Sequence, residues 1–134
     1  KELTPDEVYE VFRSNFVNKE TALKITEAHY KQENGGITAT VTADYKGSTA
    51  VYTGSGNGRL DAVSDAIKNG LGLSYSLTYN EHAIEVGSKS KAAAYVEICD
   101  KNGNSFWGAG IHTDIINSSV SALVSAINNS DMVK

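Results

Sequence analysis

The sequence predicts an α+β domain built from two pseudo-symmetric βββα units, preceded by a short N-terminal helix. Two observations lead to this fold class. Thr42–Gly56 matches Val96–Gly110 without gaps, and Ala66-Ile67 then matches Ala122-Leu123, so one small supersecondary unit is repeated. In addition, each predicted helix of the repeat follows three predicted strands, an order typical of antiparallel α+β layers. A parallel doubly wound sheet would instead alternate one strand with one helix.

A short amphipathic helix is expected before the repeat. Thr4 can cap it, Pro5 suits its first position and Glu7 completes a capping box. The apolar side chains that follow share one helical face: Val8, Val11, Phe12 and Phe16. We therefore expect a helix or connector over residues 1–20 and a domain over 21–134, with its units at 21–70 and 71–129.

The first unit is expected to hold three strands and a helix. Ile37–Tyr45 alternates apolar and polar residues strictly, which is the pattern of a half-buried strand. The neighbouring strands are expected at Leu23–Gln32 and Ser48–Thr53. After the glycines, helical spacing of apolar residues predicts a helix over Leu60–Leu71, closed by Asn69-Gly70.

The second unit repeats that order with one difference. Strands are expected at Leu73–Tyr79, Ala92–Cys99 and Ser105–Gly108. The stretch Asn80–Lys91 is polar and is expected to be an excursion between strands. A last helix is expected over Ile116–Ile127, ended by Asn128-Asn129.

Composition excludes several classes of function. The 134 residues suit one domain, and the net charge of −4 argues against nucleic acid or an anionic membrane as the main partner. No apolar run approaches the ~20 residues that span a bilayer. The single Cys99 forms no internal disulfide, which fits a reducing cytoplasm.

The residues alone reveal no catalytic constellation, metal site or cofactor site. The Gly-rich run Gly54–Gly58 does not follow a βαβ strand, which argues against a dinucleotide fingerprint. The histidines His29, His82 and His112 are too scattered for a metal motif, and no nucleophile elbow occurs. Two interpretations of the glycines remain open: close packing of strand on helix, or a loop that holds a ligand.

Four runs, in this order and spacing, resemble one known domain. They are Gly56–Ala62 (GNGRLDA), Tyr79–Ala83 (YNEHA), Lys91–Glu97 (KAAAYVE) and Phe106–Ile111 (FWGAGI). The chain is similar, over Thr4–Asn128, to the C-terminal regulatory domain of alpha-isopropylmalate synthase and of its relative citramalate synthase.

The resemblance implies a homodimer that binds a feedback amino acid near the dimer interface. In that family the domain follows a TIM-barrel acyltransferase, which nothing in this chain matches. The resemblance therefore implies a regulatory piece that does not catalyse a reaction by itself. It places the ligand among ten residues: Asn57, Gly58, Leu60, Asp61, Ser76, Tyr79, Ala83, Ser90, Ile111 and Thr113.

Three functions follow as expectations. The first is feedback regulation by leucine in leucine biosynthesis, and the second is an isoleucine-binding domain of citramalate synthase. The third is a structural dimerisation module without a ligand, favoured by polar residues at Ser76 and Ser90 and by Arg59, where the family often has apolar residues and proline.

Overall fold

The computed structural model describes residues 18, 20–86 and 89–133, and for 81–86 and 89–90 it describes the backbone only. The helix predicted near the N-terminus lies outside this part of the chain. The elements are β1 (Leu23–Glu33), β2 (Gly36–Tyr45), β3 (Ser48–Gly56), α2 (Arg59–Leu71), β4 (Ser76–Val86), β5 (Lys89–Cys99), β6 (Ser105–His112) and α3 (Ile115–Asn129).

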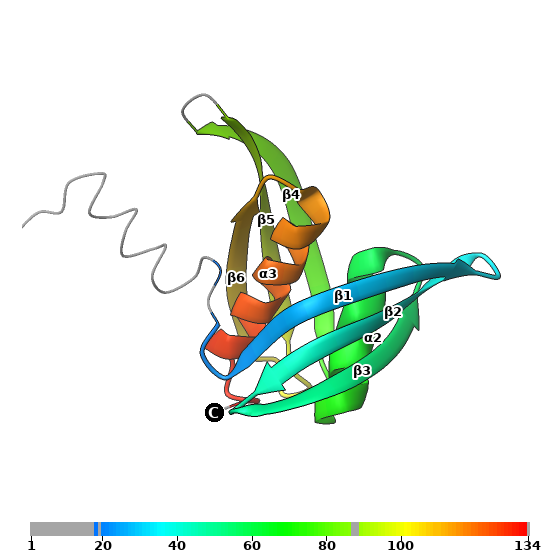
Figure 1. Cartoon of the computed structure of the whole chain (residues 1–134). Coiled ribbons are helices and arrows are strands. Elements are labelled where there is room, and N and C mark those ends of the chain that lie inside the picture. Colours follow the sequence, from blue (N-terminus) through cyan, green and yellow to red (C-terminus); the bar gives the residue numbers. More distant parts are fainter. Residues whose placement is uncertain (1–17, 19, 87–88, 134) are drawn as a thin grey trace, which may run out of the picture.

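Two antiparallel three-stranded sheets, each followed by a helix, confirm the predicted α+β class (Figure 1). The strand orders are β1-β2-β3 and β4-β5-β6. In each unit the helix packs on the last two strands, α2 on β3 and β2, α3 on β6 and β5. The inner face of each first strand is therefore left largely uncovered by the helix of its own unit.

One hydrophobic core joins the two units. It contains fully buried side chains from both sheets and both helices, among them Val41, Ile67, Val96 and Leu123. The start of β1 lies beside the end of α3, because the Asn128 amide bonds the backbone of Leu23 (Figure 1). Strand β1 thus belongs to the first sheet and also contacts the second unit.

The Gly-X-Gly runs lie inside strands and let each helix approach its sheet. A Cβ at Gly54 would overlap the backbone of Ala66, and a Cβ at Gly108 would overlap the backbone of Ala122 and Ala126. These two strands extend beyond their predicted ends, β3 to Gly56 and β6 to His112. For these strand glycines the structure supports the packing interpretation.

The predicted polar excursion at Asn80–Lys91 is wrong. β4 runs to Val86 and β5 begins at Lys89, and the two strands pair from Asn80 with Tyr95 to Val86 with Lys89. Strand pairing joins backbone N–H and C=O groups, so polar side chains do not by themselves end a strand.

The predicted ends of both helices also need correction. Asn69-Gly70 lies inside α2, which ends at Leu71, and Gly72 follows it in the left-handed region at φ 67°. Gly70 instead makes room for the Tyr52 ring, which a Cβ there would overlap. Similarly, Asn128-Asn129 belongs to α3, and Ser130 caps that helix by donating its backbone N–H to Ile127.

The repeat is real at the level of elements, but the ungapped residue match fails in its first strand. Gly54 and Gly108 occupy equivalent places against their helices, yet Gly54 pairs with Ala39 and Gly108 with Val96. Thr42, which the sequence match equates with Val96, pairs instead with the exposed Val51. The two hairpins differ in turn and strand length, which shifts the register.

Candidate functional site

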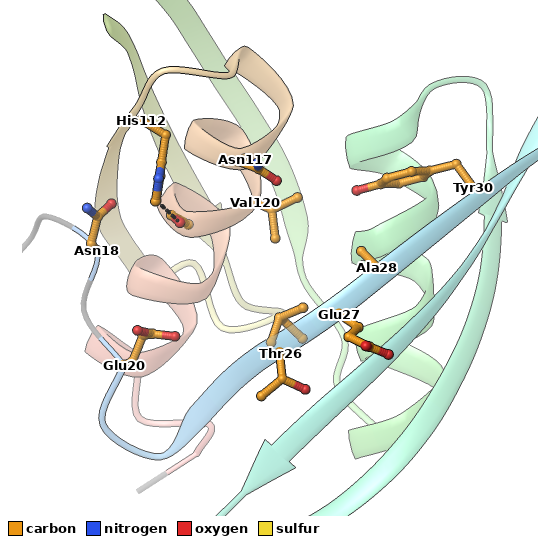
Figure 2. A pocket seen from close by; sticks show the side chains of 11 residues that line it. Asn18, Glu20, Thr26, Glu27, Ala28, Tyr30, His112, Asn117 and Val120 are labelled. Carbon is orange, nitrogen blue, oxygen red and sulfur yellow. Dashed lines mark hydrogen bonds between the residues drawn. The ribbon is translucent and has the colours of Figure 1, made fainter.

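A groove of about 310 Å³ lies between the two units (Figure 2). One wall is the inner face of β1, and the other is formed by α3 and the end of β6. The groove exists because α2 covers β2 and β3 and leaves β1 free on this side. Its lining residues are Asn18, Glu20, Ile25, Thr26, Glu27, Ala28, Tyr30, His112, Asn117, Val120 and Ser121.

The groove combines apolar and polar groups. Ile25, Ala28 and Val120 provide apolar surface. Across from β1, the His112 ring Nε2 lies 3.0 Å from the Ser121 hydroxyl, so these two polar groups partner each other. The lining is thus about as polar as it is apolar. Sites for small organic ligands also combine apolar surface with a few placed polar groups.

Asn18 holds the end of β6 at one side of this groove. Its backbone N–H donates to the Ala109 carbonyl at 2.8 Å, and its side chain bonds both backbone groups of Ile111, at 3.1 and 3.3 Å. The edge of β6 is therefore occupied at Ile111. The Ile111 carbonyl already accepts one bond, although a carbonyl oxygen has a second lone pair.

The two helix starts differ in how their free N–H groups are satisfied. At α3, the Asp114 carboxylate accepts hydrogen bonds from Ile116 (2.8 Å) and Asn117 (3.2 Å). At α2, the N-cap position is Gly58, and no side chain caps the helix. Because the first N–H groups of a helix attract anions, the uncapped start of α2 is a better candidate for an external carboxylate than the start of α3, which Asp114 already caps.

Tyr30 lies near both helix starts. The Arg59 guanidinium, on the first residue of α2, sits 5.5 Å from the centre of the Tyr30 ring. Burial raises the pKa of the Tyr30 phenol, the charge of Arg59 lowers it, and the charge of Asp114 raises it again. Tyr30 also lines the same groove as Asn117 in the first turn of α3, so residues from the starts of both helices lie around this side of β1.

Four of the predicted residues lie close together at the start of α2, because they are neighbours in the sequence. Asn57 is exposed, and Gly58 adopts an extended conformation at φ −135° that any residue can take. Asp61 lies in the first turn and is exposed. Leu60 is only 5% exposed and belongs to the core, so its backbone N–H is better placed for a ligand than its side chain.

The predicted residues on the second sheet fall into two places. Ala83, Ser90 and Ile111 lie at one end, since Ala83 pairs with Ala92, Ser90 with Glu85, and Ile111 with Ala93. Ser76 pairs with Cys99 at the other end, about 23 Å along the strand from Ala83 at ~3.3 Å per residue.

Tyr79 and Thr113 complete the predicted set. Tyr79 lies between the two ends of β4, opposite the buried Val96, and is 43% exposed. Thr113 is exposed in the connection between β6 and α3, one residue before the cap Asp114. Together with Ile111 it lies on the segment that leads into the α3 start.

Sequence reasoning missed the groove and Tyr30. Tyr30 was covered only by the predicted strand Leu23–Gln32 and was given no role, and His112 was noted only as a scattered histidine. Alternation in Leu23–Gln32 could have placed Tyr30 on the inner face, but no local pattern shows that α2 leaves that face open.

Among residues 18, 20–86 and 89–133, no three His, Cys, Asp or Glu side chains gather where they could hold a metal ion. Within the same residues, no helix has the length and apolarity needed to cross a membrane.

The architecture defines a class: a paired-βββα domain with an open helix start and a groove between its units. Comparison with known proteins identifies the family. The chain matches the LeuA allosteric (dimerisation) domain over residues 2–130, and it belongs to that family. This confirms the resemblance seen in the sequence.

Several curated relatives share the name 2-isopropylmalate synthase. The chain is 49% identical to that of Desulfitobacterium hafniense (strain Y51) over 129 residues, which is 96% of the chain and 23% of the relative. It is 35% identical to that of Helicobacter hepaticus, covering 96% of the chain and 24% of the relative. It is 36% identical to that of Mycobacterium leprae, covering 95% and 21%. The chain thus spans about a quarter of the length of these relatives.

Proposed function

We propose that this chain is the regulatory part of a 2-isopropylmalate synthase and that it binds leucine as a feedback inhibitor. The observation that carries the proposal is the 49% identity to a 2-isopropylmalate synthase over 96% of the chain. The chemistry of the acyl transfer would then belong to a catalytic barrel outside this sequence.

The α2 start is the proposed place for the carboxylate of the amino acid. The N–H groups of Leu60 and Asp61 lack a side-chain cap, and the positive end of the helix dipole favours a negative group there. The cationic Arg59 adds to this attraction, whereas the Asp61 carboxylate opposes it. The capped start of α3 is the less suitable of the two.

The rest of the proposed site comes from the second unit. Carbonyl groups near Ile111 and Thr113 would accept hydrogen bonds from the ammonium, and the β4 residues Tyr79 and Ala83 would wall the aliphatic side chain. The proposed set remains Asn57, Gly58, Leu60, Asp61, Ser76, Tyr79, Ala83, Ser90, Ile111 and Thr113. Because Ser76 lies at the far end of β4, it would reach the ligand only from another copy of the chain.

Parallel calorimetric titrations with leucine, isoleucine and valine test the proposal. We expect leucine to bind most tightly, although one branched side chain against another decides only ~1–3 kcal/mol. Tighter isoleucine binding would favour the citramalate synthase alternative. Binding of none of the three would leave a structural dimerisation module and overturn the proposed effector role.

The regulatory consequence needs the parent enzyme. Truncation before Thr4 should abolish inhibition by leucine while some activity survives, because a ligand shifts an enzyme only through different affinities for two states. Equal inhibition of the full-length and truncated enzymes would contradict the proposal.

A further inference from the structure

Tyr30 lies where the groove meets the start of α2. It is on the inner face of β1, opposite the buried Ala39, and it lines the groove. In Figure 2 its ring projects from β1 toward the α3 side, where Asn117 and Val120 line the opposite wall. Tyr30 therefore lies at the boundary between the two units.

Arg59 connects Tyr30 to the helix start. It is the first residue of α2 and directly follows Gly58, which has no side chain to fix the turn. The guanidinium over the Tyr30 ring, 5.5 Å from its centre, is within the range of a cation–π contact. Because the α2 start has no capping side chain, this contact ties its first residue to β1, the strand of its own sheet that α2 does not cover.

Strand β1, which carries Tyr30, is anchored to the second unit at its beginning. The Asn128 amide accepts hydrogen bonds from the backbone N–H groups of Ala22 (3.1 Å) and Leu23 (2.8 Å) and donates to the Leu23 carbonyl (2.9 Å). β1 is thus held by α3 at its beginning and holds α2 through Tyr30 further along. The position of the α2 start relative to α3 depends on both attachments.

We propose that Tyr30 is a positioning residue of the effector site, which holds Arg59 and thereby the uncapped start of α2 in the geometry that receives the ligand carboxylate. The inference rests on the proposed function for the identity of the ligand. Tyr30 belongs to the first unit and is not one of the ten predicted site residues. Its role would be to fix the geometry of the helix start at which those residues bind the ligand.

Three variants of the full chain test the positioning role of Tyr30. Tyr30→Phe keeps the ring, Tyr30→Leu removes it, and Tyr45→Leu is the matched control. Tyr45 also carries a cation over its ring, Lys46 at 5.3 Å, but it does not line the groove. By calorimetry we expect leucine binding to weaken about two- to fivefold in Tyr30→Leu and to stay near wild type in the other two. Equal affinity in Tyr30→Leu and wild type would overturn the inference.

A double-mutant cycle separates positioning from general stability. In the Arg59→Gln background, Tyr30→Leu should cause no further loss of affinity, since the contact is already gone. Additive losses would contradict the inference. Melting temperatures measured in parallel identify any variant whose fold is impaired.

A readout without ligand distinguishes this inference from the proposed function. Backbone amide NMR shifts of residues 57–61 should change in Tyr30→Leu and remain in place in Tyr30→Phe and Tyr45→Leu. If wild type binds none of the amino acids, the proposed function fails while these shifts still report on the positioning of the helix start. Unchanged shifts in Tyr30→Leu would overturn the role of Tyr30.

Discussion

Asn128 joins the two units through a single buried amide. It is 3% exposed, and both of its polar atoms bond the backbone at the start of β1. Two residues 105 positions apart in the sequence are thereby held together. A buried amide with its partners satisfied is favourable, but removing it leaves backbone groups unpaired.

Replacing Asn128 with leucine should destabilise the domain strongly. The loss should be about 1–3 kcal/mol for each backbone group left without a partner, measured by urea unfolding. Asn129→Leu is the control, because that amide is more exposed and donates to the Trp107 carbonyl near the surface. Equal losses in the two variants would argue against a special role for Asn128.

Tyr75 makes stability sensitive to alkaline pH. Burial is the main cause that raises its pKa to about 12; the hydrogen bond with Ser64 lowers the pKa, and the charge of Asp65 raises it further. In the unfolded chain a tyrosine has its pKa near ~10. The folded state therefore holds the proton longer, and its advantage is complete below pH ~10 and is lost as the pH rises toward 12.

The comparison of wild type with Tyr75→Phe isolates this effect. At neutral pH, wild type should be more stable by about 0.5–1.5 kcal/mol, because the phenol bonds the Ser64 hydroxyl at 2.7 Å. Above pH 10 wild type should lose stability relative to Tyr75→Phe, by up to about 1.4 kcal/mol per pH unit. A difference that stays constant from pH 7 to pH 11.5 in urea titrations would contradict the assignment.

At the scale of elements, the glycines divide into two kinds. Gly54, Gly56, Gly108 and Gly110 lie where a strand meets a helix, and a Cβ at any of them would overlap the helix. At Gly58 a Cβ would meet only the Asp61 carboxylate, at 3.6 Å, and the backbone there is extended. The strand glycines are therefore required for packing, whereas Gly58 tolerates a side chain sterically.

A matched pair of valine substitutions tests this division. Gly108→Val should unfold the domain or lower its stability by several kcal/mol, because the helix backbone must move away. Gly58→Val should keep the melting temperature close to wild type and weaken leucine binding, by crowding the proposed carboxylate position. A Gly58→Val variant that unfolds, or that binds every branched-chain amino acid as well as wild type does, would show that Gly58 is not a ligand-loop residue.

At the scale of the whole molecule, each sheet has one face covered by its helix and another that carries exposed side chains. Trp107 is 51% exposed and Val51 is 62% exposed. Both side chains lie on the face of their sheet that is opposite to its helix. The family is described as a dimerisation domain. A self-complementary contact between two copies would cover such surface.

We therefore expect the chain to be a homodimer in solution. Sedimentation equilibrium at tens of micromolar should give twice the chain mass of 14.3 kDa. The variant Trp107→Glu should shift the equilibrium toward monomer if the outer face of the second sheet is the interface. A wild-type mass near 14.3 kDa would contradict the dimer.

The sequence by itself determined the fold class, the order of the elements and the duplication. Strict alternation in β2 and helical spacing in α2 and α3 are local signals, since the burial of one face imposes a period on neighbouring residues. The resemblance to the family also came from the sequence, because its motifs are contiguous runs. Where a signal was compositional, as in the polar stretch Asn80–Lys91, it misled, because backbone pairing does not depend on apolar side chains.

Only the tertiary structure decided the features that join distant residues. The groove depends on which strands α2 and α3 cover, and the link from Asn128 to Leu23 spans most of the chain. Likewise, the contact of Tyr30 with Arg59 requires that β1 and the α2 start meet. Each of these depends on how whole elements pack, and a local pattern of residues carries no information about a neighbour that is distant in sequence. The strand glycines show the same division: the sequence marked them as special, and the packing of the helices showed why.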